Sequence, residues 1–329
     1  MKRYPRLLSL ILALPLILDI EVARAQELEK VVIGHSSLRN DIAALWVPKE
    51  LGIFRKHGLD ADIVLITGGV RMTQAILSGS APMGFTGATL VASAVAAGSD
   101  TVLVLGITNR LTYDIWAKPE IKQPEDLKAK TLAISSFGSS SHVASFLMLQ
   151  HFKIDEKKDR ITFLAIGDEP TRAQALIGGR IDATIVDPSV SAPLKERGFS
   201  YLGNLQQLGV PFVNNALVST RRYLKEHPRT AEAVVKSIVD GNAYMLNPAN
   251  RAKVTEILAK HLRLGGKEAE KAYEDLLPKV ERKPYPSMEA VKATVQVMGL
   301  RNLKIAQLKP EDLVDVSILQ KLEQSGSVR

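Results

Sequence analysis

A run of small polar residues interrupts an apolar part of the chain at residues 135–142, which read SSFGSSSH. A serine hydroxyl acts as a nucleophile when a general base, itself oriented by an acid, removes its proton. The nucleophile elbow of serine hydrolases has the pattern G-x-S-x-G, and His142 stands where its last glycine belongs. No serine of the run has a lysine three residues later, as S-x-x-K requires. With no base and acid identified, the pattern disfavours nucleophilic catalysis.

The same serines suit a site that holds an anion. We expect a strand at 131–134 and a helix at 141–152, which places Ser139, Ser140 and Ser141 at the start of the helix. The first N–H groups of a helix lack helical partners and carry partial positive charge, so they bind phosphate, sulfonate or carboxylate groups. The alternative is that one serine only caps the helix. Under the binding interpretation, replacing Ser139 and Ser140 with alanine weakens ligand binding and leaves the melting temperature nearly unchanged.

Other loops follow predicted strands, and open α/β sheets bind ligands at the carboxyl ends of their strands. Arg39 is either a bidentate contact for an anion or a solvated surface residue. Asp187 accepts from a ligand hydroxyl or amine, caps a helix, or pairs with Arg39. An anion suits Arg39 and a cation suits Asp187, so the two face a zwitterion or each other. The candidate ligand-binding residues in these loops are Ser36, Ser37, Arg39, Gly69, Thr86, Gly87 and Asp187.

Short β-branched runs alternate with segments of helical spacing, which indicates an α/β fold with mostly parallel sheets. The predicted strands are 31–34, 61–66, 83–86, 101–107, 131–134, 161–166 and 183–186. The predicted helices between them are 41–54, capped by Asn40 or Asp41, and 71–77, 88–97, 141–152 and 170–177. The C-terminal part is mostly helical, with helices predicted at 230–246, 251–261, 267–277, 287–298 and 310–322.

A short internal echo indicates two similar halves. The segment QAILSG at Gln74–Gly79 returns as QALIGG at Gln174–Gly179, and Gly98 matches Gly198 at the same offset. Both copies precede a short predicted strand at the same point of the strand–helix order. The echo therefore predicts two similar α/β lobes.

The N-terminus has the features of a secretory signal peptide. Lys2, Arg3 and Arg6 precede an apolar stretch at 7–18, and Ala23–Ala25 has the small-x-small pattern of a cleavage site. Twelve apolar residues are too few for a membrane-spanning helix, which needs about 20. The chain has no cysteine, which excludes disulfides, thiol catalysis and a lipid-modified cysteine. We therefore predict residues 1–25 as a signal peptide and an unanchored periplasmic protein.

Composition argues against several other classes of function. The net charge is +8, but the basic residues are scattered among acidic ones, and the two tryptophans are too few for a nucleic-acid platform. The six histidines show no metal-ligand spacing, and neither G-x-G-x-x-G nor a Walker A motif occurs. We expect no nucleic acid, no metal and no cofactor.

Four blocks of the sequence resemble periplasmic solute-binding proteins of the sulfonate, taurine and nitrate type, which are related to binders of thiamine-pyrimidine precursors. The blocks follow the family order over roughly residues 31–220, and together they are specific where none alone would be. They read ALWVPKELGIFRKHGLDADIVLITGG (44–69), QAILSGSAPMGFTGATLVASAVAAGSD (74–100), EDLKAKTLAISSFGSSSHVASFLML (125–149) and QALIGGRIDATIVDPSV (174–190).

The resemblance implies a two-lobed type II binding protein that captures a small, anionic or zwitterionic solute by hinge closure and delivers it to the permease of an ABC importer. It implies that Ser139–Ser141 and Thr86–Gly87 are ligand loops, and we expect a monomer. The implied lobes are 26–111 with 215–329, where the C-terminal helices return to the first lobe, and 112–214. The implied crossovers lie near 109–117 and 210–216.

The chain departs from the family pattern at two places, which leaves the solute open. Pro82 stands where the first-lobe block commonly has aspartate, and Val186-Asp187-Pro188 replaces a segment that often carries an aromatic or acidic residue near its proline. Two alternatives remain. One is an enzyme similar to the pyrimidine-precursor synthase, whose Cys-rich motif this chain lacks, and the other is a sensor that presents its ligand to a membrane receptor.

Overall fold

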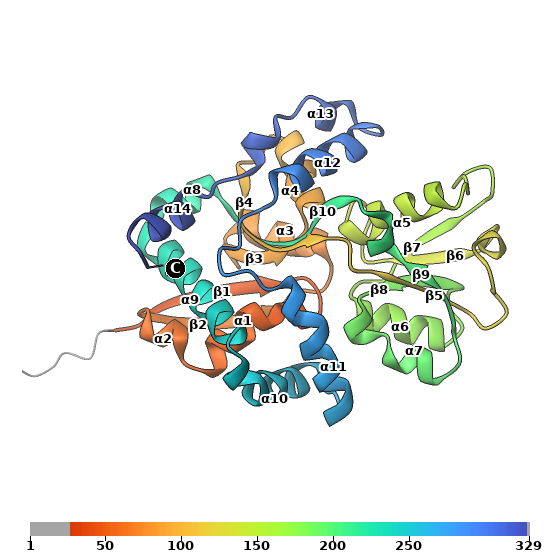
Figure 1. The fold of residues 1–329 in the computed structure, drawn as a ribbon. Helices are drawn as coiled ribbons and strands as arrows, with labels where there is room; N and C mark the ends of the chain where they lie inside the picture. Colours follow the sequence, from red (N-terminus) through yellow and green to blue (C-terminus); the bar gives the residue numbers. More distant parts are fainter. Residues whose placement is uncertain (1–26, 328–329) are drawn as a thin grey trace, which may run out of the picture.

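The computed structural model describes residues 27–327 and contains two five-stranded sheets, one in each lobe (Figure 1). The predicted signal peptide lies outside these residues. The first sheet has the order β2-β1-β3-β10-β4, formed by Glu29–His35 (β1), Leu59–Leu65 (β2), Met83–Thr86 (β3), Thr101–Arg110 (β4) and Pro211–Thr220 (β10). The second has the order β7-β6-β8-β5-β9, formed by Asp114–Ala117 (β5), Thr131–Ile134 (β6), Thr162–Ala165 (β7), Ala183–Val186 (β8) and Ser200–Asn204 (β9).

The two sheets have the same topology, which confirms the predicted two-lobed architecture. In the first sheet β10 is antiparallel to both neighbours, and the other strands share one direction. In the second sheet β5 is the reversed strand. Each reversed strand crosses from the other sheet, β5 through residues 111–113 and β10 through residues 205–210. These two crossing segments are the connections of the main chain between the sheets.

Helices cover both faces of the first sheet, and further helices follow along the chain. The helices of the first half are Ala43–Glu50 (α1), Ile53–Lys56 (α2), Gly69–Ser78 (α3) and Ala88–Ala96 (α4), and those of the second half are Ser140–His151 (α5), Glu169–Ile177 (α6) and Ala192–Glu196 (α7). The C-terminal helices are Arg221–Glu226 (α8), Pro228–Met245 (α9), Arg251–Leu262 (α10), Gly266–Leu276 (α11), Met288–Gly299 (α12), Leu303–Ala306 (α13) and Ser317–Gln324 (α14). No helix within residues 27–327 is both long and apolar enough to cross a membrane.

Alternating side chains of the first sheet enter two different cores, as the two-residue period of a strand requires. Val102 and Val104 of β4 belong to a core with α1, α9 and α10, whereas Leu103 belongs to a core with α3, α4 and α12. This second core continues through Tyr113 of one crossing segment and Phe212 of β10 into the second lobe. The C-terminal helices α9, α10 and α12 thus contribute to the cores on the two faces of the first sheet.

The internal echo marks equivalent positions of the two lobes. QAILSG ends α3 before β3, and QALIGG ends α6 before β8. Gly79 and Gly179 both adopt a positive φ, 78° and 71°, a conformation that costs little only for glycine. Each glycine therefore ends a helix and turns the chain into the next strand.

Two predicted helices differ from the structure. The helix predicted at 41–54 is broken because Gly52 adopts a left-handed conformation between α1 and α2. Asn40 and Asp41 do not cap it, since no side chain caps α1 and both residues lie in a 3-10 turn, η1 (Asn40–Ile42). The helix predicted at 310–322 is a 3-10 turn, η7 (Pro310–Leu313), followed by α14.

Candidate functional site

A cavity of about 40 Å³ lies between the lobes, where loops leave the carboxyl ends of strands from both sheets. Of the ten candidate ligand residues, all but Asp187 line this cavity. The structure therefore brings together Ser36, Ser37, Arg39, Gly69, Thr86, Gly87, Ser139, Ser140 and Ser141. The cavity also has lining residues that the sequence interpretation did not select, namely Ile42, Leu90, Tyr113, Ser135, Glu169, Arg172, Asn214 and Asn215.

The serine loop is a hydrogen-bonded turn that begins α5. Ser139 is the N-cap, and its Oγ accepts from the His142 N–H at 3.4 Å and donates to the Ser136 carbonyl at 2.7 Å. Ser141 Oγ accepts from the Ser135 N–H at 2.9 Å and lies 3.0 Å from Ser139 Oγ. Ser139 is thus both a cap, as the alternative interpretation held, and a cavity-lining residue. Removing its hydroxyl must affect α5 itself, which revises the expectation that the apo protein would be unaffected.

Ser140 belongs to a contact between the two lobes. Its Oγ donates to the main-chain carbonyl of Asn214 at 3.3 Å. Gly87 of the first lobe lies opposite, and a Cβ placed on it would be 2.0 Å from Ser140 Oγ and 3.2 Å from the Asn214 carbonyl oxygen. At this lobe spacing a side chain at position 87 would therefore displace the Ser140 hydroxyl from its contact with Asn214.

Two hydroxyls at the cavity, Ser37 Oγ and Thr86 Oγ1, are buried and have no hydrogen-bond partner within residues 27–327. A buried hydroxyl without a partner costs about 1–3 kcal/mol. Thr86 is the last residue of β3 and Ser37 lies two residues after β1, so the first sheet fixes their positions. These two groups provide free hydrogen-bonding capacity on the cavity wall.

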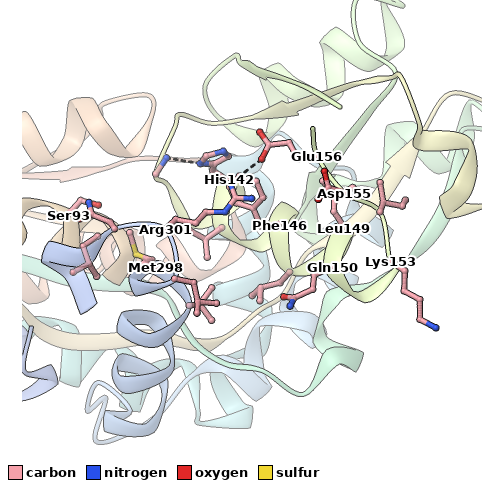
Figure 2. Close-up of a pocket in the computed structure, with 18 residues that line it drawn as sticks. Ser93, His142, Phe146, Leu149, Gln150, Lys153, Asp155, Glu156, Met298 and Arg301 are labelled. Atoms are coloured by element: carbon pink, nitrogen blue, oxygen red, sulfur yellow. Dashed lines mark hydrogen bonds and ion pairs between the residues drawn. The ribbon is translucent and has the colours of Figure 1, made fainter. Parts of the chain in front are cut away.

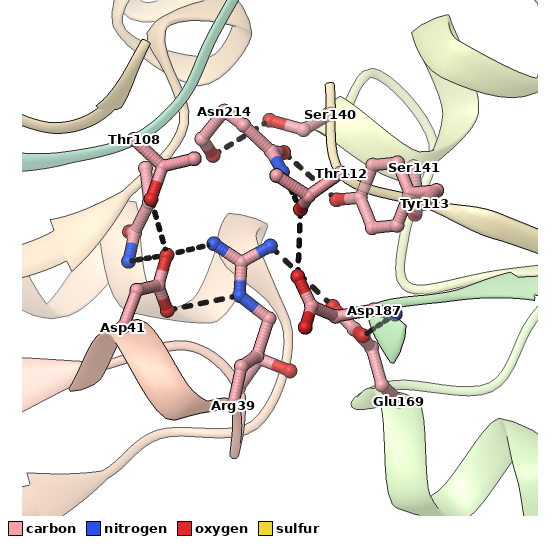
Figure 3. Close-up of polar contacts among 12 residues, drawn as sticks. Arg39, Asp41, Thr108, Thr112, Tyr113, Ser140, Ser141, Glu169, Asp187 and Asn214 are labelled. Atoms are coloured by element: carbon pink, nitrogen blue, oxygen red, sulfur yellow. Dashed lines mark hydrogen bonds and ion pairs between the residues drawn. The ribbon is translucent and has the colours of Figure 1, made fainter. Parts of the chain in front are cut away.

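Arg39 is buried, with 4% of its surface exposed, so the solvated-surface alternative is wrong. Its guanidinium donates to both carboxylate oxygens of Asp41, with an Nε–Oδ1 distance of 3.1 Å, as Figure 3 shows. Asp41 also accepts from Thr108 Oγ1 at 2.7 Å and from Asn215 Nδ2 at 3.2 Å. Burial lowers the pKa of Arg39, but Asp41 and Glu169 outweigh it and hold that pKa above its ordinary value. The guanidinium is a fixed cation at the cavity.

Glu169 and Arg172 complete the charged wall from the second lobe. Glu169 Oε1 lies 3.6 Å from Arg39 Nη1, and its Oε2 accepts from the Asp187 N–H. Arg172 donates to the Gly167 and Ile185 carbonyls at 2.5 and 2.9 Å. Burial raises the pKa of Glu169 to about 7, against the opposing effect of Arg39. Both residues follow the loop after β7. The rule that ligands bind at the carboxyl ends of strands therefore also selects this loop.

Asp187 does not line the cavity. It connects the turn that follows β8 with a crossing segment and with Lys279 of the C-terminal part. Its carboxylate accepts from the Ser189 N–H at 3.1 Å, which caps the 3-10 turn η3 (Pro188–Val190), and from Thr112 Oγ1 at 2.7 Å. Its ion pair is with Lys279, at 3.1 Å, and not with Arg39. Burial raises the pKa of Asp187, but Lys279 and Arg39 outweigh it and hold that pKa well below its ordinary range. Asp187 thus caps a 3-10 turn, as one of the alternatives held, and its role as a ligand residue stays a prediction.

Lys279 connects the lobes at a second place. It lies in the 3-10 turn η6 (Leu277–Lys279) after α11, with 8% of its side chain exposed. Its Nζ donates to Asn40 Oδ1 of the first lobe at 2.9 Å as well as to Asp187 of the second. The Asn40 N–H in turn donates to Ser189 Oγ at 3.3 Å. We call Lys279, Asp187 and Asn40 the interlobe latch.

The profile of a family described as NMT1/THI5 like matches residues 39–252, about two thirds of the chain. No curated protein matches the chain. The alkanesulfonate-binding protein SsuA of Xanthomonas axonopodis pv. citri, bound to MOPS, has 21% identity and a TM-score of 0.69, covering 87% of this chain and 96% of its own. The periplasmic nitrate-binding protein NrtA of Synechocystis PCC 6803 has 11% identity and a TM-score of 0.71, covering 92% and 91%. A zinc-bound ligand-binding component of an ABC-type import system from Staphylococcus aureus has 15% identity and a TM-score of 0.71, covering 89% and 98%. At these identities the likeness shows the periplasmic binding protein fold.

Proposed function

Since this chain belongs to the NMT1/THI5-like family, we propose that it is the periplasmic binding component of an ABC importer and captures a small organic anion or zwitterion between its lobes. The observation that carries the proposal is the pair of buried, unpartnered hydroxyls of Ser37 and Thr86 beside a fixed guanidinium. A solute oxygen at this cavity would satisfy groups whose burial is otherwise unfavourable.

The charges at the cavity favour an anionic group. Arg39 Nη1 lies 3.6 Å from Glu169, which is longer than an N–H···O hydrogen bond, so this donor is available to a solute oxygen. Neutral Glu169 adds no repulsion, and burial keeps its pKa near 7. An anion therefore finds a net positive wall once Glu169 is protonated.

The size of the cavity supports capture by closure. A volume of about 40 Å³ accommodates a small polar group but not a larger organic body at this lobe spacing. The lobes contact each other at Ser140 and at the latch, so a solute enters only after they separate. Contacts to both lobes then stabilise the closed state relative to the open state.

Catalysis is not part of the proposal. The hydroxyls of Ser135, Ser139, Ser140 and Ser141 bond to carbonyls and to one another, and within residues 27–327 no histidine ring nitrogen hydrogen-bonds to a serine hydroxyl of the site. His142 Nδ1 accepts from the Gly138 N–H instead. The predicted signal peptide agrees with an exported receptor that meets its permease at the membrane, and we propose that it acts as a monomer.

The proposal is tested by a thermal-shift screen followed by calorimetry. The screen contains nitrate, methanesulfonate, taurine, acetate, benzoate and a hydroxymethylpyrimidine, since a solute that binds the folded state raises its melting temperature. Small-angle scattering should show compaction with the compound that binds. If no compound of the panel raises the melting temperature, the proposed function is refuted.

Thr86→Val and Thr89→Val form a matched pair for locating the solute. Both threonines are buried and have an unpartnered hydroxyl, but only Thr86 lines the cavity. We expect Thr86→Val to weaken solute binding about tenfold, the value of one hydrogen bond of about 1.4 kcal/mol, and Thr89→Val to leave it unchanged. Equal affinities in the two variants would contradict this placement of the solute.

A further inference from the structure

A second, larger cavity lies on the other side of α5, at the seam between α5 of the second lobe and α12 and α13 of the C-terminal part (Figure 2). Its volume is about 580 Å³, within the range of roughly 300–1,000 Å³ of small-molecule sites. We call it the seam cavity. It shares no lining residue with the interlobe cavity, because Ser140 and Ser141 lie on one side of α5 whereas His142 and Phe146 lie on the other.

The floor of the seam cavity is apolar and buried. Its apolar lining residues with at most 9% exposure come from both walls, namely Val143, Leu149, Ile154, Met298 and Ile305. Burial of apolar ligand surface against such a floor is favourable by roughly 25 cal/mol per Å². Leu300 at the rim is 82% exposed, so apolar surface continues to the mouth of the cavity.

Three of the charged residues that line the seam cavity, Arg301, Glu156 and Asp155, are already paired, whereas Lys153 is exposed to solvent and has no ion pair within residues 27–327. Arg301 binds Glu156 at 3.0 Å, and its guanidinium carbon lies 3.5 Å from the centre of the Phe146 ring. Asp155 accepts from the main-chain N–H groups of residues 157 and 158. Burial lowers the pKa of His142 to about 4, so its ring is neutral above that pH. The buried part of the site therefore offers aromatic and aliphatic surface, and the one unpaired charge of the lining, Lys153, lies at the solvent-exposed edge.

We propose that the seam cavity is a second binding site, which takes a neutral, largely apolar molecule with an aromatic ring. Phe146 and His142, with ring centres 4.5 Å apart, form an aromatic cluster that an aromatic ligand can extend by edge-to-face contact, while Arg301 covers one face of Phe146. Since one wall belongs to the second lobe and the other to the C-terminal helices on the first, an occupant that touches both walls favours the lobe spacing of this structure.

The test uses N-phenyl-1-naphthylamine, a neutral apolar dye that fluoresces when it leaves water. The full chain should give a saturable increase in fluorescence. Val297→Trp and Leu147→Trp fill the cavity from opposite walls, and each should weaken dye binding at least tenfold. Leu303→Trp on α13 is the matched control, because Leu303 is 81% exposed and does not line the cavity, and it should bind the dye like the parent.

Two variants on opposite walls keep the test decisive, because the melting temperature of each shows whether it is folded. The proposal is overturned if the parent shows no saturable binding, or if a folded filling variant binds the dye as well as Leu303→Trp does. It is also overturned if a solute that binds the interlobe cavity displaces the dye competitively. The result does not depend on the proposed importer function, since dye binding at the seam needs no solute.

Discussion

Replacing Lys279 with methionine tests whether the interlobe latch holds the lobes together. The change keeps the length of the side chain and removes the cation that faces Asp187, whose own exposure is 1%. Removing one partner of a buried ion pair costs about 3–5 kcal/mol, because the other charge stays buried without compensation. Thr112 and Ser189 still donate to Asp187, so we expect the lower end, about 3 kcal/mol.

The protein has a route that avoids this cost, since separating the lobes returns Asp187 to water. A change of about 3 kcal/mol moves the closed-to-open ratio by a factor of about 150. We therefore expect Lys279→Met to have a larger radius of gyration by small-angle scattering at pH 7. In urea its free energy of unfolding should fall by at most about 3 kcal/mol.

Lowering the pH should reduce the loss of unfolding free energy that Lys279→Met causes. In the parent, the lowered pKa of Asp187 stabilises the fold above the ordinary carboxyl pKa, and this contribution is lost as pH falls through the folded pKa. In the variant, burial without Lys279 raises the pKa of Asp187, so the carboxyl takes up a proton more readily. The difference in unfolding free energy between parent and variant should be smaller at pH 4 than at pH 7.

Two reference variants decide the interpretation. Lys279→Met combined with Asp187→Asn leaves no buried charge and should recover at least half of the loss. Lys271→Met on α11 removes an exposed pair with Asp275 at 3.7 Å, which is worth about 0–1 kcal/mol. The reasoning fails if Lys279→Met matches Lys271→Met in stability and size, or if the double variant is as unstable as the single one.

Two further predictions concern the interlobe cavity. Glu169 holds its proton to about pH 7 in the folded chain and releases it near pH 4.5 when unfolded, so the free energy of unfolding of the parent should fall by up to about 3 kcal/mol as the pH rises from 4.5 to 7. Glu169→Gln should flatten this dependence of unfolding free energy on pH in urea titrations, and an unchanged dependence would contradict the assignment. Ser139→Ala removes the α5 cap and should cost about 1 kcal/mol in unfolding free energy. Ser140→Ala, whose hydroxyl has one contact at 3.3 Å, should cost less than half as much, and equal losses would argue against the cap.

Much of the fold could be predicted because its signals are local. Runs such as Ala183–Val186 are apolar and β-branched, and glycines with a positive φ mark the helix ends at 79 and 179. The rule that ligands bind at the carboxyl ends of strands placed nine candidate residues at one cavity, because parallel strands bring their ends to one edge. Whether these nine residues bind the solute stays a prediction.

The interlobe latch could not be predicted, because its partners are distant in sequence. Lys279 lies 92 residues after Asp187, and periodicity within the C-terminal helices does not show which lobe a given turn will touch. The Arg39–Asp41 pair could have been predicted from the sequence, because the two residues are only two positions apart. It was missed because aspartate before an apolar helical segment also fits an N-cap, and the local pattern does not distinguish the two roles.

The near contact at Gly87 suggests a practical use. Its φ of −85° suits alanine, so a methyl group there meets no backbone strain. The methyl would lie 3.2 Å from the Asn214 carbonyl oxygen of its own sheet and 2.0 Å from Ser140 Oγ of the second lobe, which would have to move by about 1 Å to restore a contact of 3.0 Å. We expect Gly87→Ala to shift the equilibrium towards a wider lobe spacing without altering a charge. The variant would help to crystallise or label an open form. In the natural chain, Gly87 has a hydrogen atom at this position, which allows the two lobes to come into contact.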